Sequence, residues 1–208
     1  MSRVKNKPHS IKKPVGLTGG IGSGKSSVAQ YCKEQFGIKY IDADLVCRDL
    51  LAPRAPGWEA FRKNFGDKFL AQDQTIDRQK LRTAIFQDLD LRQRLNAIVH
   101  PLARTEIKNM LAGSDPDQCL VEVPLLFEAG WEEDFSSIIV VYATDESCLE
   151  RLTQRDQISR DAAIRAIAAQ LPINEKVRRA DHIIDNSKSW EETCRQLEQL
   201  GKILWQAK

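Results

Sequence analysis

The chain has 208 residues, of which 42% are hydrophobic and 29% are charged, so its composition is that of a globular protein and excludes a disordered chain. Its 31 basic and 29 acidic residues leave a net charge of +2, which gives no reason to expect a nucleic-acid partner. No apolar run approaches the roughly 20 residues that span a bilayer. Its five cysteines form no Cys-x-x-Cys pair. We therefore expect a cytoplasmic protein that contacts no membrane and requires no oligomer.

The first thirteen residues, "MSRVKNKPHSIKK", differ from the rest of the chain because basic residues stand there among polar residues and a proline. Polar segments of like charge do not bury enough apolar surface to fold. We expect residues 1–13 to form a flexible tail, with a nucleic-acid-binding arm as the alternative. The remaining residues, 14–208, are long enough for one domain.

Short apolar runs alternate with longer helical patterns along residues 14–208. This alternation predicts an α/β fold in which helices cover both faces of a parallel sheet. Five strands are expected, at Val15–Thr18, Ile38–Asp42, Cys119–Val123, Ser137–Ala143 and His182–Asp185.

About seventy residues between the second and third expected strands contain no convincing strand. Leu95, Ile98, Val99 and Leu102 recur there at helical spacing, which predicts an inserted helical lobe. A second helical excursion precedes the last strand, and an amphipathic helix closes the chain from about Trp190 to Trp205. The expected division is a core of 14–43, 117–148 and 181–208, a helical lobe of 44–116, and a lid of 149–180.

The stretch "VGLTGGIGSGKSSVAQ" contains Gly19-x-x-x-x-Gly24-Lys25-Ser26, the pattern of a phosphate-binding loop. It follows an expected strand and opens an expected helix, as such a loop requires. Glycines let successive backbone N–H groups turn toward an anion, and the helix N-terminus adds its positive dipole end. Lys25 is expected to reach the β- and γ-phosphates, and the Ser26 hydroxyl to bind Mg²⁺. The alternative is a glycine-rich turn with a solvated lysine.

A phosphate loop alone does not distinguish a kinase from a GTPase or an ATP-driven motor. A GTPase needs an Asn-Lys-x-Asp motif after the loop, whereas Asn6-Lys7 precedes it and lacks the aspartate. No motif for pairing the nucleotide sites of a motor is visible. Other motifs in the chain are therefore needed to distinguish these classes.

Asp42 and Asp44 stand at the C-terminal end of the second expected strand, the edge at which open parallel sheets bind ligands. We expect the phosphate loop at the same edge of a neighbouring strand. One carboxylate could then take the proton of an acceptor hydroxyl that attacks the γ-phosphate. Equally, Asp44 could cap the following helix and pair with Arg48.

Two further groups carry charge suited to a triphosphate. Glu122 ends an expected strand, where a second carboxylate often orients Mg²⁺ through water, and the alternative is an acid that faces solvent. Arg151 and Arg155 are four residues apart on one helical face, where they could close over the transferring phosphoryl group. The alternative for them is a solvated helix face.

Seven stretches together resemble dephospho-coenzyme A kinases, in order and in spacing, over about Val15–Gln199: "LTGGIGSGKSSVA", "IDADLVCRDLL", "IDRQKLRTAIF", "LNAIVHPLARTEI", "VPLLFEAG", "RLTQRD" and "ADHIIDN". The resemblance implies the fold of nucleoside and nucleotide monophosphate kinases. It also implies transfer of the γ-phosphate of ATP to the ribose 3′-hydroxyl of dephospho-coenzyme A, the last step of coenzyme A synthesis. Mg²⁺ would accompany ATP.

The resemblance implies a function for individual residues. ATP would be bound by Gly20, Ile21, Gly22, Ser23, Gly24, Lys25, Ser26 and Ser27, with Asn186 near the adenine. The acceptor would meet Asp44, Arg78, His100, Pro101 and Leu125. Catalysis would rest on Asp44 as the base and on Lys25, Arg151 and Arg155, and Mg²⁺ would be bound by Ser26 and, through water, by Glu122.

Two positions depart from the family pattern: Ser27 stands where the family often has Thr, and Glu122 where Asp is frequent. Taken without the resemblance, His100-Pro101 predicts the start of a helix with Pro in its first position. Two other functions remain possible on these residues. They are a kinase for another nucleoside or nucleotide, and an ATP-binding regulatory module.

Overall fold

The computed structural model describes residues 13–205 of the chain. The predicted tail, apart from Lys13, lies outside the described residues. The chain forms two compact units, each described by itself below. The sheet unit comprises the residues up to Ile41 and those from Gly113 onward, and the helical unit is Asp42–Ala112.

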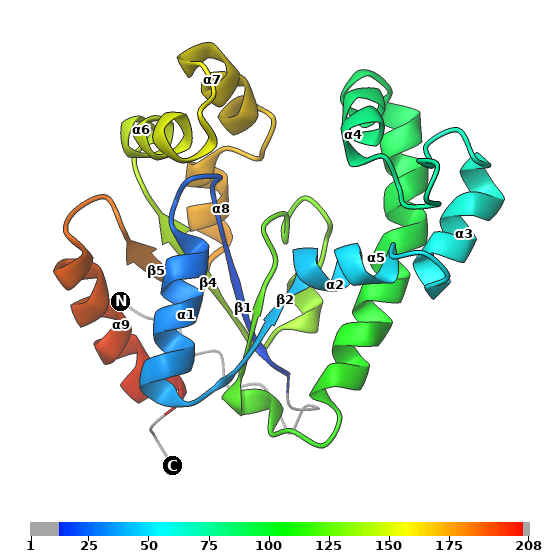
Figure 1. Ribbon diagram of the computed structural model, residues 1–208. Coiled ribbons are helices and arrows are strands. Elements are labelled where there is room, and N and C mark those ends of the chain that lie inside the picture. The colour runs from blue at the N-terminus through cyan, green and yellow to red at the C-terminus, as the bar shows by residue number, and fades with distance from the viewer. Residues whose placement is uncertain (1–12, 206–208) are drawn as a thin grey trace. The chain divides into compact units, whose positions relative to one another are not determined.

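Five strands form one sheet in the order β2-β3-β1-β4-β5 (Figure 1). Strand β1 pairs in parallel with β3 and β4, and β4 pairs in parallel with β5. The predicted fold class and the existence of all five strands are confirmed. The strands are β1 (Val15–Gly19), β2 (Lys39–Asp42), β3 (Cys119–Glu122), β4 (Ser137–Tyr142) and β5 (His182–Asp185).

The strand order corrects one expectation. The strand that precedes Asp44 was expected beside the strand of the phosphate loop, but β3 lies between β2 and β1. Strand order depends on contacts between distant parts of the chain, which local sequence patterns do not encode.

Helices α1 and α9 pack on one face of the sheet. Ile139 and Val141 of β4 point into their shared core, whereas the alternate residues Ile138 and Val140 are buried on the other side of the strand. Strand β4 is therefore covered on both faces. The helices of this unit are α1 (Lys25–Phe36), η1 (Pro116–Gln118), η2 (Glu132–Asp134), α6 (Asp145–Asp156), α7 (Arg160–Ala168), α8 (Ile173–Arg179) and α9 (Trp190–Leu204).

The helical unit has its own hydrophobic core. Phe61 is fully buried and its ring lies 4.9 Å from that of Phe65 and 6.3 Å from that of Phe69, measured between centroids. Leu91, Leu95 and Val99 of the long helix α5 pack against this aromatic group, as do residues of the shorter helices. The unit consists of α2 (Ala43–Leu50), α3 (Pro56–Phe65), α4 (Arg78–Gln87) and α5 (Leu89–Leu111).

Pro101 lies inside α5, so the expectation that a helix begins there is wrong. A proline within a helix removes one backbone hydrogen bond. Val99 and Ala103 on either side are buried, so tertiary packing maintains the helix through the proline. Between residues 13 and 205, no helix combines the length and the apolar character needed to cross a bilayer.

Candidate active site

The loop between β1 and α1 has the geometry of an anion cradle. Gly24 precedes α1 in the left-handed conformation, with φ of 91°, and no side chain caps the helix. An added Cβ at Gly24 would lie 2.3 Å from Nδ2 of Asn186, so both the backbone angle and the space require glycine. The first-turn N–H groups and the helix dipole are therefore available to attract an anion.

Lys25 lies within the loop structure rather than in solvent. Its side chain is 8% exposed and its Nζ donates a hydrogen bond to the Gly20 carbonyl oxygen at 2.8 Å. The alternative of a glycine-rich turn with a solvated lysine is therefore wrong. Ser26 and Ser27 follow in the first turn of α1, and both are exposed.

Two side chains from distant segments hold the carbonyl groups of the loop. Asn186 Nδ2 donates to the Ser23 carbonyl oxygen at 2.8 Å, and Arg151 donates to the carbonyl oxygens of Gly22 at 3.3 Å and Asn186 at 2.7 Å. Thr193 fixes the Asn186 amide by donating to its Oδ1 at 2.9 Å. The loop is therefore held in shape by α6, by the segment after β5 and by α9.

Arg151 and Arg155, the arginines of the predicted lid, differ in their surroundings. Arg151 is half-buried against the loop, whereas the Arg155 side chain is 65% exposed and pairs with Asp156 at 2.7 Å. The solvated-face alternative therefore describes Arg155 but not Arg151. Both border a cavity of about 480 Å³, which is lined by Gly22, Gly24, Lys25, Ser26, Ser27, Arg151, Gln154 and Arg155.

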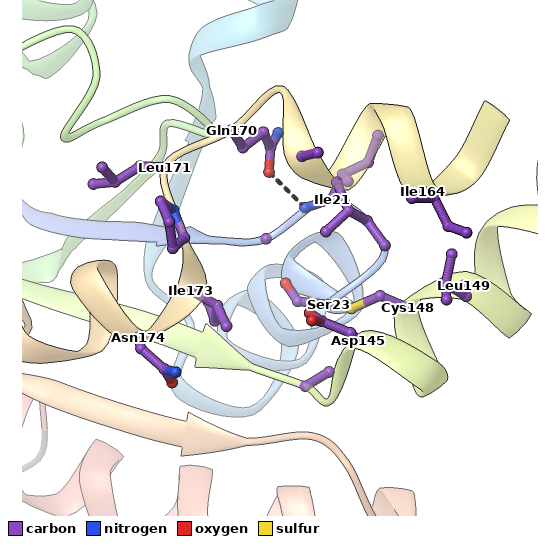
Figure 2. A pocket seen from close by; sticks show the side chains of 15 residues that line it. Ile21, Ser23, Asp145, Cys148, Leu149, Ile164, Gln170, Leu171, Ile173 and Asn174 are labelled. Carbon is purple, nitrogen blue, oxygen red and sulfur yellow. Dashed lines mark hydrogen bonds between the residues drawn. The ribbon is translucent and has the colours of Figure 1, made fainter. Parts of the chain in front are cut away.

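A second cavity, of about 510 Å³, lies between the loop and the segment from α6 to α8 (Figure 2). Ile21 and Ser23 of the loop face apolar side chains of this segment, among them Ile164 and Ile173. The Gln170 Oε1 accepts a hydrogen bond from the Ile21 N–H at 2.9 Å, which ties the loop to the residues that follow α7 (Figure 2).

Glu122 is buried beside the loop. Its side chain is 4% exposed, and its two oxygens accept hydrogen bonds from the Ser26 hydroxyl at 3.1 Å and from the Tyr40 hydroxyl at 2.8 Å. The alternative of a strand-end acid facing solvent is therefore wrong. A hydroxyl and a carboxylate are hard oxygen donors of the kind Mg²⁺ prefers, so this pair fits a magnesium ion that phosphates and water also bind.

In the helical unit, Asp42 and not Asp44 caps α2. The Asp42 carboxylate accepts hydrogen bonds from the N–H groups of Asp44 at 2.9 Å and Leu45 at 3.1 Å. The exposed Asp44 lies in the first turn of the helix, so the capping alternative for Asp44 is wrong. Burial raises the pKa of the Cys47 thiol to about 11, and the negative charges of Asp44 and Asp42 add to this shift.

The other acceptor candidates lie on different elements. Arg78 is exposed and begins α4, whereas His100 is half-buried within α5. Burial lowers the pKa of His100 below 6.5, and the nearby Arg104 adds to this effect. Leu125 belongs to the sheet unit, where it is 46% exposed in the loop after β3.

Three residues of the phosphate-site network were missed by sequence reasoning: Tyr40, Gln170 and Thr193. Tyr40 carried one usable signal, because a tyrosine in an expected strand usually needs a hydrogen-bond partner when its hydroxyl is buried. Gln170 and Thr193 stand in ordinary amphipathic segments and carried no such signal.

Comparison with known proteins identifies the family. The model of the dephospho-CoA kinase family matches residues 13–192. A dephospho-CoA kinase of Thermosynechococcus vestitus is 40% identical over 190 residues, which cover 91% of this chain and 94% of the relative. The chain belongs to the dephospho-CoA kinase family.

Solved structures agree with this assignment. A Campylobacter jejuni dephospho-CoA kinase has 29% identity and a TM-score of 0.69, with 95% of this chain and 100% of that one covered. The Thermus thermophilus protein TT1252 has 30% identity and a TM-score of 0.81, with 94% and 99% covered. The predicted family, the P-loop kinase fold and the enzyme activity, phosphorylation of dephospho-coenzyme A in the last step of coenzyme A synthesis, are therefore confirmed.

Proposed function

We propose that residues 20–27 bind the ATP phosphates, that Lys25, Arg151 and Arg155 act on the γ-phosphate, and that Asp44 acts on the 3′-hydroxyl of dephospho-coenzyme A. The observation that supports this most directly is the cavity of about 480 Å³ at which Lys25, Ser26, Arg151 and Arg155 meet. A cavity with three cations and a helix N-terminus suits a triphosphate.

Lys25 and Arg151 stabilise the charge that spreads over the transferring phosphoryl group. Lys25 exchanges its hydrogen bond to the Gly20 carbonyl for phosphate oxygens. Arg151 already contacts the loop, so little side-chain freedom remains for it to lose. Arg155 is the more exposed of the two arginines, and it leaves Asp156 to reach the phosphates. Fixed charges of this kind stabilise the transition state at little reorganisation cost.

Ser26 and Glu122 would hold the magnesium ion that accompanies ATP, Ser26 directly and Glu122 through water. When bound, this ion neutralises phosphate charge. Tyr40 keeps the Glu122 carboxylate oriented through the hydrogen bond to its Oε2. Chelation with EDTA should abolish turnover and added Mg²⁺ should restore it; full activity in EDTA contradicts this assignment.

Asp44 takes the proton of the acceptor hydroxyl. It is exposed in the first turn of α2, and the Asp42 cap fixes the backbone that carries it. A carboxylate is a competent proton acceptor when it lies within hydrogen-bond reach of the hydroxyl. Arg78, His100, Pro101 and Leu125 contact other parts of the acceptor, and Asn186 lies near the adenine of ATP.

The test compares Asp44→Asn with Asp49→Asn, an exposed aspartate on the same helix. Loss of a general base lowers turnover by about 10²- to 10⁴-fold. We expect this loss of ADP release for Asp44→Asn only, with unchanged binding of a non-hydrolysable ATP analogue. Wild-type turnover in Asp44→Asn excludes Asp44 as the base. Faster turnover with adenosine, cytidine or nucleoside monophosphates than with dephospho-coenzyme A contradicts the substrate.

A further inference from the structure

Lys176, on α8, has a fully buried side chain with a cationic end. Its exposed fraction is 0%, and its Nζ lies 2.8 Å from the Glu128 Oε1. The same Nζ donates a hydrogen bond to the Pro124 carbonyl oxygen at 3.2 Å. A buried ammonium is tolerated only when it is paired and hydrogen-bonded. Lys176 therefore binds the loop of residues 123–130, which follows β3, at two points.

The start of that loop is also bonded to β1. The Thr18 hydroxyl donates to the Pro124 carbonyl oxygen at 3.1 Å, so this oxygen accepts from both Thr18 and Lys176. The Val123 N–H donates to the Leu17 carbonyl oxygen at 2.8 Å. Thr18 immediately precedes the phosphate loop, and Glu122 immediately precedes Val123. The backbone at residues 123–124 is thus held beside the phosphate site.

The Glu128 carboxylate connects the same loop to the lid segment. Its Oε1 accepts a second hydrogen bond, from the Leu171 N–H at 3.0 Å. Leu171 follows Gln170, whose side chain accepts from Ile21 of the phosphate loop (Figure 2). Residues 170–176 are therefore fixed to the loop after β3 at one end and to the phosphate loop at the other.

The loop of residues 123–130 has one exposed apolar side chain among buried neighbours. Leu126 and Phe127 are buried at 0% and 4%, whereas Leu125 is 46% exposed. Turn hydrogen bonds, such as that from Ala129 N–H to the Leu125 carbonyl oxygen at 2.9 Å, keep the loop compact. Because a compact loop moves as one piece, the contacts of Pro124 and Glu128 determine the positions of Leu125 and of the adjoining Glu122.

We propose that Lys176 and Glu128 are positioning residues for phosphoryl transfer. Lys176 holds the Pro124 carbonyl and Glu128 holds the Leu171 N–H, and through these contacts the pair aligns Glu122, Leu125 and the start of residues 170–176 with the phosphate loop. This inference rests on the proposed function, because it assigns the pair to the same reaction. Neither side chain touches the reacting atoms.

The experiment separates positioning from stability. In Lys176→Met, the Glu128 carboxylate, whose side chain is 21% exposed, loses its cation and the Pro124 carbonyl loses a donor, so we expect the protein to lose stability. The double variant Lys176→Met with Glu128→Leu removes both charges, and such replacements are often neutral or stabilising. The matched control is Arg178→Met with Glu175→Leu, because that pair lies on the same helix at 2.7 Å but is exposed, at 72% and 42%.

We expect the Lys176/Glu128 double variant to regain the Tm lost in Lys176→Met but not the turnover. Small misplacements of groups near a reaction centre lower rates by up to about 10²-fold, so we expect a kcat about 10- to 100-fold below wild type. Affinity for a non-hydrolysable ATP analogue should not change. The Arg178/Glu175 control should keep wild-type kcat and Tm.

Recovery of both Tm and kcat in the Lys176/Glu128 double variant overturns the proposal, because the pair then serves only folding. If that variant does not fold, Thr18→Val provides the test, since it removes the other donor to Pro124 without burying a charge. A kcat equal to wild type in Thr18→Val likewise overturns it. Absence of ADP release by the wild-type protein with dephospho-coenzyme A would instead contradict the proposed function.

Discussion

The phosphate site and the proposed acceptor residues are built in different ways. At the phosphate site, Asn186, Arg151 and Thr193 are hydrogen-bonded to the loop or to one another, so the cradle is a fixed network within one unit. In the helical unit, Asp44 and Arg78 are exposed in the first turns of separate helices. The proposed triphosphate site is thus a loop fixed by hydrogen bonds, whereas the proposed acceptor residues Asp44 and Arg78 are exposed side chains on a unit with its own core.

The largest effect is expected from a substitution that destabilises the core of the helical unit alone. Phe61→Ala removes a fully buried ring, and such changes cost about 3–5 kcal/mol of stability. We expect turnover to fall at temperatures where the unit unfolds, while an ATP analogue still binds. Thermal unfolding and calorimetric binding measure this. Leu89→Ala, at a 67% exposed position of α5, is the control. Equal loss of ATP binding would show that the units fold as one.

Lys25→Met removes charge from the phosphate site alone. Loss of one preorganised donor costs about 10²–10³ in kcat, or about 2.7–4 kcal/mol. Steady-state kinetics should show this loss, with thermal stability near wild type. Lys33→Met, at an exposed position of the same helix, should leave kcat unchanged. Similar kinetics for the two variants would remove Lys25 from the reaction.

Tyr40→Phe tests whether one hydrogen bond of the network beside the phosphate loop affects both stability and the Mg²⁺ requirement. The variant loses the hydrogen bond to the buried Glu122 carboxylate, and bonds to charged groups contribute about 1.5–3 kcal/mol to stability. We expect a lower free energy of unfolding and a higher Mg²⁺ concentration for half-maximal activity. Denaturant titration and Mg²⁺-dependent kinetics measure both. An unchanged Mg²⁺ requirement would show that Tyr40 serves stability alone.

The smallest expected effect is on the pH dependence of stability, to which one histidine in each unit contributes. Burial lowers the pKa of His100 in the helical unit and of His182 in β5, with Asp181 opposing the shift at His182. Because the folded pKa lies below 6.5, the unfolded chain takes up protons first as pH falls, and stability is lost. His100→Gln should reduce the loss of stability between about pH 7 and pH 5. An NMR-titrated pKa above 6.5 at His100 would contradict this.

The sequence predicted the strands well because each one contains adjacent apolar residues in a short segment, and β1, β3 and β4 are buried along most of their length. The expected run at His182–Asp185 coincides with β5, and each of the others differs by one residue at one end. It did not predict that β3 lies between β1 and β2, because strand order is set by long-range pairing. Pro101 misled the helix prediction because packing around Val99 and Ala103 overrides the local preference of proline.

For the candidate site, the loop pattern predicted where Lys25 and Ser26 stand, because the glycine spacing itself encodes the backbone turn. The residues that contact the loop were harder to predict from the sequence. The contacts of Arg151 with Gly22 and of Gln170 with Ile21 join residues more than a hundred positions apart. Only tertiary folding brings such residues together, so local sequence spacing does not predict their contacts.

The buried Cys32 in the sheet unit and the half-buried Cys47 in the helical unit give each unit its own chemical reporter. Burial raises the pKa of Cys32 in the sheet unit to about 12 and that of Cys47 in the helical unit to about 11. The thiolate is the reactive form, so at neutral pH both thiols react slowly with alkylating reagents, and opening of their surroundings should accelerate the reaction. The alkylation rates of Cys32 and Cys47 therefore record, separately and in solution, how often each unit opens. Added nucleotide should lower the alkylation rate of Cys32 more than that of Cys47.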